Sequence, residues 1–553
     1  MTVLAAPPAP PADAGSIIRD QQQGRIPQLK QLPAREKARQ DTAKAESGVL
    51  VTVKEFTFSG FAGLATEAEL QTLVAGAKGK TITFGELKGF ADKITAHLKK
   101  KGWGRARAYL PKQDVTSGII EIAVLQGASD GRLEIKMDKT TRVKACVLRG
   151  IGERAIHKGQ PLNDNELERA ALLMNDLPGV MARLSLAPGA ETGTTSVTVT
   201  ASEGPIVSGM VIGDNYGNRY TGTWRANANV SVNDPFRYGD QISGVITEAR
   251  GLSQGRIGYS IPVLMPGLKA SLAYTGMRYE LLDLDTPSLD YKGSSNALDA
   301  ALGYSIIRSR TSNLSTSLSY GYKVLVDKSA GETVHDKQLH SVNLSFNGDF
   351  YDQFWGGGAG SYSAGVTTGS FNDSAPGNIS YSGTKFTHFN LALARLQRLS
   401  GKFNMSISGS AQISLDNLDS SEKFSLGGPF AVRAYPVGES PGDNGQLVRA
   451  DIQYNIPLSS TWGNIQLSSF FDAGHVTLNQ ERYTGDVANA TASNSYWLQG
   501  AGIGVNYIVS DKGALRCVWA HVIGDNPGRS IQGNNSDGHD DKSRFWLQGE
   551  IYF

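Results

Sequence analysis

The chain has 553 residues, of which 40% are hydrophobic and 19% are charged, so it is long enough for three or more domains and is neither disordered nor collagen-like. Its 54 Lys and Arg residues nearly balance its 52 Asp and Glu residues, and the net charge of +2 gives no reason to expect nucleic acid as a partner. The chain has only two cysteines, Cys146 and Cys517, and their distance in sequence excludes a disulfide framework. It has no run of about 18 apolar residues, which excludes a helical membrane protein but not a membrane β-barrel.

The N-terminal region, residues 1–26, contains one short predicted helix. Asp13 can cap a helix that begins at Ala14 and ends near Arg25, although this pattern by itself is also typical of a frayed terminus. The predicted helix includes Ile17, Ile18 and Gln22. Residues 27–50 are polar and interrupted by prolines, which indicates a linker. The first residues lack the basic and apolar parts of a signal peptide, so either the protein is cytosolic or a signal peptide has been removed, and the barrel pattern described below favours removal.

Residues 51–128 form a first predicted α+β module with the element order βααββ. Two capping boxes, Thr66 with Glu69 and Thr83 with Glu86, each open a helix. The second helix has an apolar stripe made of Leu87, Phe90, Ile94 and Leu98. The predicted strands cover residues 51–58, 105–110 and 117–126.

Residues 129–204 repeat this order in a second module. A short helix is expected at 140–149, with Cys146 buried in or beside it, and Asn163 with Glu166 is predicted to cap a longer helix. The longer helix has a stripe of Leu167, Ala170, Ala171 and Met174, and strands are expected near 132–138, 181–187 and 194–202. Two small sheets in tandem have open edges, which can accept an extended partner strand.

From residue 205 to residue 553, apolar and small polar residues alternate with a period of two. Leu314, Leu318 and Tyr320, for example, share one face, and Ser315 and Ser317 share the other. The pattern predicts sixteen strands, most of them with at least the roughly 9–11 residues of a tilted membrane strand. Alternation alone is also typical of a soluble sandwich.

The lengths of the connections decide between a sandwich and a membrane barrel. Connections after even-numbered strands are short, such as 309–311, and several after odd-numbered strands are long. The predicted long loops are 280–295, 327–339, 415–445, 476–495 and 525–542. Short turns on one side, long loops on the other and an even strand number are typical of outer-membrane barrels. The last strand alternates up to the aromatic Phe553, which resembles the insertion signal of such proteins, so we predict a transmembrane barrel of 16 antiparallel strands.

One loop and one strand contain a candidate ion pair. The longest loop includes Val432, Arg433, Ala434 and Tyr435, and a later strand includes Phe470, Asp472 and Gly474. Asp472 has the parity of the polar residues Gln466 and Ser468, so we expect it to face the lumen. An arginine and a lumenal carboxylate can form a bidentate pair that holds the loop inside the barrel. By itself, Arg433 is more typical of a solvated charge on an extracellular loop.

Taken together, these features resemble the TpsB transporters of two-partner secretion, which belong to the superfamily of outer-membrane proteins with POTRA domains. The resemblance covers nearly the whole chain. It rests on the two motifs around Arg433 and Asp472 and on 177–180, 214–217, 221–222 and 233–235. Two positions depart from the usual pattern: Ala434 stands where the loop motif usually has Gly, which puts the backbone freedom of the loop tip in doubt, and Asp234 separates the Asn and Pro of a turn.

The resemblance implies a function. The N-terminal helix would plug the barrel at rest and leave when a client arrives, and the loop with Arg433 would fold into the lumen and dock on Asp472. The POTRA modules would lie in the periplasm and capture an unfolded client along the edge strand and helix groove of the first module. The candidate client-binding residues are Phe90, Ile94, Leu98 and Tyr109.

The implied client is a large TpsA exoprotein. A hemolysin, a filamentous adhesin, a heme-acquisition protein and a contact-dependent inhibition toxin all use this type of transporter. The client would cross the pore in extended form without ATP and fold outside the cell. The resemblance also implies a monomer embedded in outer-membrane lipid, without a cofactor.

Three other classes of protein are less consistent with the sequence. A solute porin would lack the two modules and the loop motif, and a barrel-assembly insertase usually has more POTRA modules and leaves the terminal helix unexplained. For an enzyme, the sequence offers no Ser-His-Asp or paired-carboxylate set. The glycine run 500–504 lies in a predicted strand and opens no helix, and the eight histidines lack metal-ligand spacing. His539 lies in an acidic loop that is typical of a solvated surface.

Overall fold

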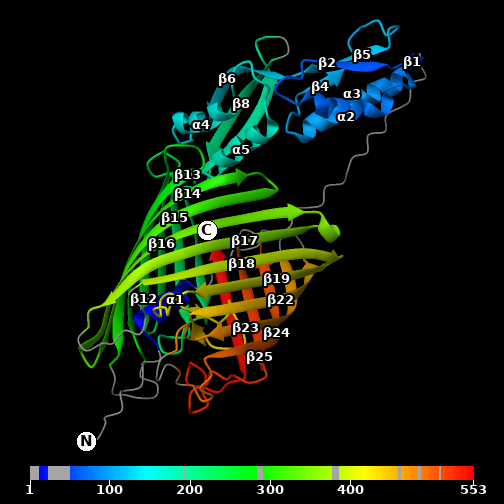
Figure 1. Ribbon diagram of the computed structural model, residues 1–553. Helices are drawn as coiled ribbons and strands as arrows, with labels where there is room; N and C mark the ends of the chain where they lie inside the picture. The colour runs from blue at the N-terminus through cyan, green and yellow to red at the C-terminus, as the bar shows by residue number, and fades with distance from the viewer. Residues whose placement is uncertain are drawn as a thin grey trace, which may run out of the picture.

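The computed structural model describes residues 12–22, 50–191, 194–282, 290–375, 385–458, 463–482, 487, 489–509 and 512–553. Two α/β modules lie beyond one end of a large β-barrel, and helix α1 (Ala14–Gln22) lies within the outline of that barrel (Figure 1). No described helix is long and apolar enough to cross a membrane.

The first module has two layers, with helices packed on a small sheet. Its elements are β1 (Leu50–Thr52), β2 (Glu55–Ser59), α2 (Glu67–Val74), η1 (Ala75–Ala77), β3 (Thr81–Thr83), α3 (Phe84–Lys100), β4 (Arg107–Tyr109) and β5 (Ile119–Leu125). The sheet order is β2-β5-β4, and β1 pairs with β3 in a separate two-stranded sheet. The predicted order βααββ is therefore incomplete. Strand β3 has only three residues and ends at a helix cap, so it is too short to give a period-two signal.

Both predicted capping boxes are present in this module. At the start of α3, the Glu86 backbone N–H donates to the Thr83 hydroxyl at 3.2 Å, and the Thr83 backbone N–H donates to the Glu86 carboxylate at 2.7 Å. The bonds from the backbone N–H and the hydroxyl of Thr83 hold the pKa of the Glu86 carboxyl below its usual range. The capping box therefore fixes the start of the helix that provides the apolar stripe.

Replacing Thr83 by alanine is expected to destabilise the first turn of α3 by about 1 kcal/mol, because the Glu86 N–H loses its side-chain acceptor. Amide hydrogen exchange in the full-length protein should show faster exchange at the start of α3. Thr57→Ala, at an exposed position of β2, is the matched control and should leave this exchange unchanged. Equal exchange in Thr83→Ala and the native protein would contradict the role of the cap.

The second module repeats this architecture. Its elements are β6 (Ala128–Met137), α4 (Ala145–Gly152), η2 (Glu153–Ala155), α5 (Asp164–Asn175), β7 (Val180–Pro188) and β8 (Thr194–Glu203), with the sheet order β6-β8-β7. Asn163 caps α5 by accepting a hydrogen bond from the Asn165 N–H at 2.9 Å, not through a box with Glu166. The prediction that Cys146 is buried is wrong. Helix α4 buries Leu148 and Ile151, and Cys146 lies away from both and is exposed.

The remainder of the described chain is a closed antiparallel barrel of sixteen strands, which confirms the predicted architecture. The strands are β9 (Val207–Asp214), β10 (Arg225–Asn233), β11 (Gln241–Ala249), β12 (Leu252–Pro262), β13 (Leu268–Glu280), β14 (Lys292–Arg308), β15 (Ser312–Ser329), β16 (Glu332–Asp352), β17 (Gly358–Asp373), β18 (Lys385–Ser400), β19 (Phe403–Ser414), β22 (Asn444–Pro457), β23 (Asn464–Thr477), β24 (Ser495–Val509), β25 (Gly513–Ile523) and β26 (Ser543–Tyr552). Strand β26 pairs with β9 and closes the barrel, and the 3-10 turn η3 (Phe354–Gly356) joins β16 to β17.

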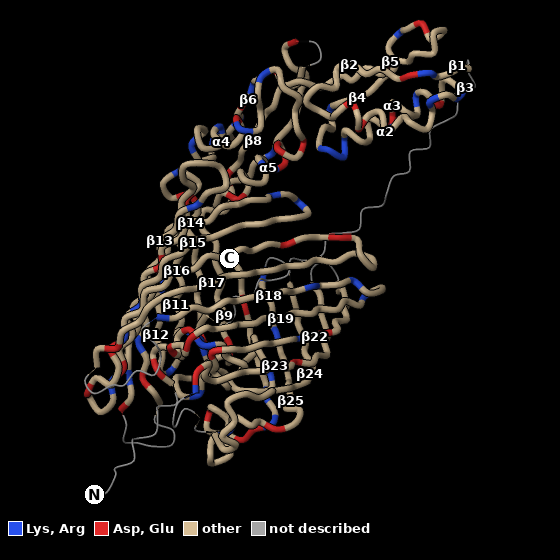
Figure 2. The backbone as a smooth tube through the Cα atoms, viewed as in Figure 1, with Lys and Arg blue, Asp and Glu red and all other residues tan. Residues whose placement is uncertain are grey.

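The outer face of the barrel is apolar, as the alternation predicts. Leu302 and Leu318 are directly opposite each other on neighbouring strands, and both are exposed on the outer wall, together with Leu298 and Tyr320. Charged residues are sparse across the middle of the wall and frequent at its two ends and in the modules (Figure 2). An apolar band between two polar zones is the surface that a lipid bilayer requires.

The predicted long loop at 327–339 is wrong. Strands β15 and β16 continue through it and are joined at Ala330 and Gly331, both with positive φ (49° and 85°). The two strands extend beyond the apolar band, where neither face contacts lipid. Polar residues therefore occupy both faces there, and the period-two pattern that distinguishes strand from loop disappears.

Helix α5 and the motif at 177–180 attach the second module to the turns at one rim of the barrel. Asp176 accepts two hydrogen bonds of 2.7 Å from Arg308, and Arg169 donates to the carbonyl oxygen of Ile306 at 3.0 Å. Leu177 packs against Gly239, where a Cβ would lie 2.8 Å from a Leu177 methyl group. A Cβ on Gly179 would lie 3.2 Å from the Asn233 Cβ, so the motifs 177–180 and 233–235, which are distant in sequence, meet at this joint.

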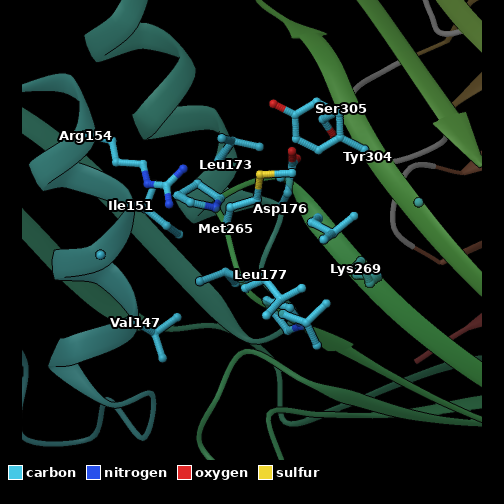
Figure 3. A pocket seen from close by; sticks show the side chains of 18 of the residues that line it. Val147, Ile151, Arg154, Leu173, Asp176, Leu177, Met265, Lys269, Tyr304 and Ser305 are labelled. Atoms are coloured by element: carbon cyan, nitrogen blue, oxygen red, sulfur yellow. The ribbon is translucent and has the colours of Figure 1, made fainter.

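A pocket of about 800 Å³ lies at the same joint, between α4, α5 and the turn from β12 to β13. Figure 3 shows its side chains. Its apolar lining includes Val147, Ile151, Leu173, Leu177 and Met265. The module thus contacts the barrel through a ring of ion pairs and hydrogen bonds around an incompletely filled apolar space.

Candidate functional site

The segment between β19 and β22 folds back into the barrel. It contains the short strands β20 (Phe424–Ser425) and β21 (Pro441–Gly442), which pair with each other. Val432, Ala434 and Tyr435 each have 0% exposure and pack with Leu498 and Phe470 of the barrel wall. A loop with this burial occupies the lumen and does not extend into solvent.

Arg433 and Asp472 form the bidentate pair that the two motifs predict. Arg433 Nε donates to Asp472 Oδ2 at 2.8 Å, and Nη2 donates to Oδ1 at 2.7 Å. The backbone N–H of Arg433 also donates to Oδ2 at 3.1 Å. Arg433 is 6% exposed and Asp472 is 0% exposed, so neither charge is solvated and each depends on the other.

Three further side chains hold Arg433. Its Nη1 donates to Asp451 Oδ1 at 2.9 Å, and its guanidinium carbon lies 3.4 Å from the centre of the Phe470 ring. The indole N–H of Trp546 donates to the Arg433 carbonyl oxygen at 2.7 Å. Trp546 is on the last strand, and its ring packs edge-on against Tyr216 of the 214–217 motif. The loop is therefore attached to both sides of the seam where the barrel closes.

Small residues make room for the docked loop. The Cβ of Ala434 faces Gly500, where another Cβ would lie only 2.5 Å away, and a Cβ on Gly474 would overlap a methyl group of Leu426. Ala434 is absent from the residues with positive φ, so its backbone does not require glycine. Alanine at position 434, where the family motif usually has glycine, therefore fits because the facing residue, Gly500, has no side chain.

Helix α1 lies in the lumen, in contact with the barrel wall. The backbone N–H of Ser16 donates to Asp13 Oδ1 at 2.8 Å, which is the predicted cap. Ile17 and Ile18 are each 2% exposed and belong to a cluster with Leu252 and Tyr279. Gln22 lines a cavity of about 580 Å³ along the wall. The helix ends at Gln22, and the remainder of the predicted segment, residues 23–26, lies outside the described residues.

The N-terminus of α1 is attached to the same loop that contains Arg433. Ser420 Oγ donates to Asp13 Oδ2 at 2.6 Å, and Arg19 Nη1 donates to the Ser420 carbonyl oxygen at 3.2 Å. On the wall, the Ala14 N–H donates to Asp327 at 2.9 Å. Helix and loop therefore form one packed unit inside the barrel.

Replacing Gly15 by valine is expected to loosen α1. A Cβ there would overlap the Ser420 hydroxyl and lie 2.9 Å from the Ser421 backbone nitrogen, and overpacking of this kind costs about 1–3 kcal/mol. Planar-bilayer recordings should show longer open times than for the native chain. Gly213→Val, where no atom lies within 4 Å of the added Cβ, is the control. Native open times in Gly15→Val would show that the helix does not occupy this position.

The structure divides the four candidate client-binding residues into two pairs. Ile94 and Leu98 have 0% exposure in the core of the first module, because α3 turns this stripe toward the sheet. A bound strand cannot contact them here, so their assignment to the client surface is wrong. Phe90 is partly buried at the edge of this core, and Tyr109 is 46% exposed on β4, an edge strand.

Sequence reasoning missed Arg449, Asp451 and Trp546. Arg449 and Asp451 have the lumenal parity of β22, directly opposite Asp472 and Phe470 of β23, so strand pairing could have found them. Trp546 offered no such signal, since its partner is a backbone oxygen of a distant loop.

The chain matches known proteins over most of its length. Residues 193–507 match the family described as haemolysin secretion/activation protein ShlB/FhaC/HecB, and residues 51–127 match the ShlB-type POTRA domain. The chain is 26% identical over 492 residues to the heme/hemopexin transporter protein HuxB of Haemophilus influenzae, covering 87% of this chain and 83% of that protein. It is 24% identical over 482 residues to the outer membrane transporter CdiB of Escherichia coli, covering 84% and 80%.

A solved structure has the same fold. CdiB from Escherichia coli matches with a TM-score of 0.75 and 20% sequence identity, covering 100% of both chains. The family match spans more than half of the chain and contains both the loop and its carboxylate partner. The chain therefore belongs to the ShlB/FhaC/HecB family of outer-membrane transporters, which secrete partner exoproteins and have POTRA domains in the periplasm.

Proposed function

We propose that this chain exports a large TpsA exoprotein of the hemolysin, adhesin or toxin class, and that the structure corresponds to its closed resting state. The observation that carries this proposal is the occupied lumen. Helix α1 and the loop with Arg433 fill the barrel together and are joined to each other through Ser420. Export of a polypeptide requires that at least the helix leave.

Capture of the client is the first proposed step. The strands β2 and β4 are the edges of the three-stranded sheet in the first module, and an extended client can add to such an edge. In the structure, Gln71 donates to the Phe56 carbonyl oxygen of β2 at 3.0 Å and the Ala108 N–H of β4 donates to the Thr95 hydroxyl at 2.9 Å, so a client strand would replace such side-chain bonds. Tyr109 on β4 and Phe90 on α3 supply apolar surface beside it. Capture before export keeps the client extended, since part of its backbone hydrogen bonding is then provided by the module.

Passage through the lumen is the second step. The cavity that Gln22 lines has the small neutral side chains of Ser319, Ser341, Asn343 and Thr367, together with the charged side chains of Arg256, Asp299, Lys323 and Glu422. The charged residues are paired, Arg256 with Asp299 and Lys323 with Glu422, and the hydroxyl and amide groups can exchange hydrogen bonds with a moving backbone. Folding of the client outside the cell then makes export irreversible, with no need for ATP.

The proposed working unit is a monomer in outer-membrane lipid. The barrel is closed by the pairing of β26 with β9, so its strands need no second copy. Its outer wall is apolar around the described circumference, which suits contact with acyl chains.

A secretion assay tests the proposed function. The chain and a candidate client are produced together in a bacterial host that lacks other two-partner transporters, and the client is measured in the medium and in the periplasm. Secretion that depends on the transporter is expected. Retention of every candidate client in the periplasm, despite a correctly inserted barrel, would reject the export function.

A further inference from the structure

Four charged side chains meet where the loop docks on the wall. Arg433 comes from the loop, Arg449 and Asp451 from β22, and Asp472 from β23. With both arginines present, the two positive and two negative charges balance. When the loop leaves, it removes one positive charge and leaves two carboxylates with a single arginine.

Arg449 stays on the wall when the loop leaves. It is directly opposite Asp472 in the pairing of β22 with β23, and its Nε lies 3.6 Å from Asp472 Oδ1. This Nε is buried and has no hydrogen-bond partner among the described residues, while Arg433 occupies both oxygens of Asp472. The docked state thus holds a second arginine within ion-pair distance of Asp472, with its Nε not hydrogen-bonded to that carboxylate.

This arrangement matters because the docked Arg433 bridges two carboxylates, Asp472 and Asp451. When the loop leaves, both carboxylates lose this shared cation, and neighbouring carboxylates without a cation are unfavourable, which opposes undocking. A second arginine within reach removes most of this penalty, since a small movement of its side chain converts a 3.6 Å approach into a hydrogen-bonded pair.

We propose that Arg449 is a replacement counter-ion for Asp472, which pairs with it when Arg433 leaves and so permits the loop to undock. Arg449 acts as a positioning residue through Asp472 and touches no client. The inference rests on the proposed function only in that undocking serves export, and undocking itself can be measured without a client.

The test measures how often the loop undocks. Ala431, which is 2% exposed on the loop, is replaced by cysteine in a Cys146→Ser, Cys517→Ala background of the full-length protein. The rate of labelling by a hydrophilic maleimide is then measured on folded, heat-modifiable barrels in lipid nanodiscs. In Arg449→Gln the rate is expected to fall about tenfold or more, because undocking would leave Asp472 unpaired. Arg449→Lys keeps the charge and should label at close to the native rate.

A double mutant separates counter-ion exchange from general damage. In an Asp472→Asn background the carboxylate that Arg449 would neutralise is absent, so adding Arg449→Gln should no longer slow labelling relative to Asp472→Asn alone. Arg395→Gln removes an arginine paired with Asp352 elsewhere on the wall and is the control. Native labelling in Arg449→Gln, equal slowing by Arg449→Lys, or slowing that persists with Asp472→Asn would each overturn the inference. If the variants differ in labelling as expected but no client is secreted, only the proposed export function is rejected.

Discussion

Alanine at Arg433 or at Asp472 is expected to abolish export of the client while leaving the barrel inserted in the membrane. Asp472→Ala removes three hydrogen bonds that Arg433 donates to this carboxylate, and Arg433→Ala removes two side-chain bonds to Asp472 and one to Asp451. Each substitution leaves a charge that is at most 6% exposed without its main partner. Loss of one member of such a pair costs about 3–5 kcal/mol, which is enough to displace the loop from its seat. The barrel itself persists, because its strand pairing does not depend on the loop. Secreted client in the medium and heat-modifiable barrel in the membrane are the two measurements.

Arg516 provides the matched control for this prediction. It also faces the lumen, but its partners are neutral: the amides of Asn506 and Gln548 and the Tyr216 hydroxyl. Arg516→Ala should therefore leave secretion close to native. If both Arg433→Ala and Asp472→Ala secrete normally, the docked loop has no part in export and the assignment of this pair fails.

Much of the fold could be predicted because the physical constraint repeats along the chain. Every barrel strand must present apolar residues to lipid and polar residues to the lumen, so the alternation recurs in all sixteen strands. An error in the bounds of one strand therefore does not change the predicted architecture. The error at 327–339 occurred where this constraint ends, beyond the lipid-facing band. The predicted strand at 51–58 is divided into β1 and β2, and the missed strand β3 has three residues, which is too short for any period to be recognised.

The site was less predictable, because its contacts join positions that are far apart in sequence. The pair of Arg433 and Asp472 was reached through motif resemblance, and the parity of β23 then placed Asp472 correctly in the lumen. Parity could not distinguish core from surface in the first module. An apolar stripe such as the one with Ile94 and Leu98 is expected both for a helix face that packs in the core and for one that binds a client. Only the packed structure shows that α3 turns this stripe toward the core.

Contacts of the plug with the loop were outside the reach of the sequence. Gly15 lies against Ser420 and Ser421 across more than 400 positions, and nothing near either segment indicates this approach. The contact has a functional consequence, since movement of α1 removes two hydrogen bonds that hold the Ser420 segment. Departure of the helix and loosening of the loop are therefore coupled in this chain.

Deletion of residues 14–22 is expected to convert a mostly closed pore into one with sustained openings, with little loss of secretion. The deletion removes Ile17 and Ile18 from the lumenal cluster and leaves the cavity beside Gln22 continuous with the space that the helix occupied. The docked pair of Arg433 and Asp472 remains, because none of its hydrogen bonds comes from α1. Single-channel conductance in planar bilayers compares the deletion with the full chain.

The two outcomes of this comparison separate the plug from the loop as the main barrier to ions. Sustained current in the deletion, with rare openings in the full chain, assigns closure to α1. Unchanged, rare openings in the deletion would mean that α1 is not the plug and that the docked loop closes the pore by itself. In that case adding Arg433→Ala to the deletion should open it, since the loop would then lose its attachment to Asp472. A large steady current from the full chain would contradict both assignments, because neither element would then close the lumen at rest.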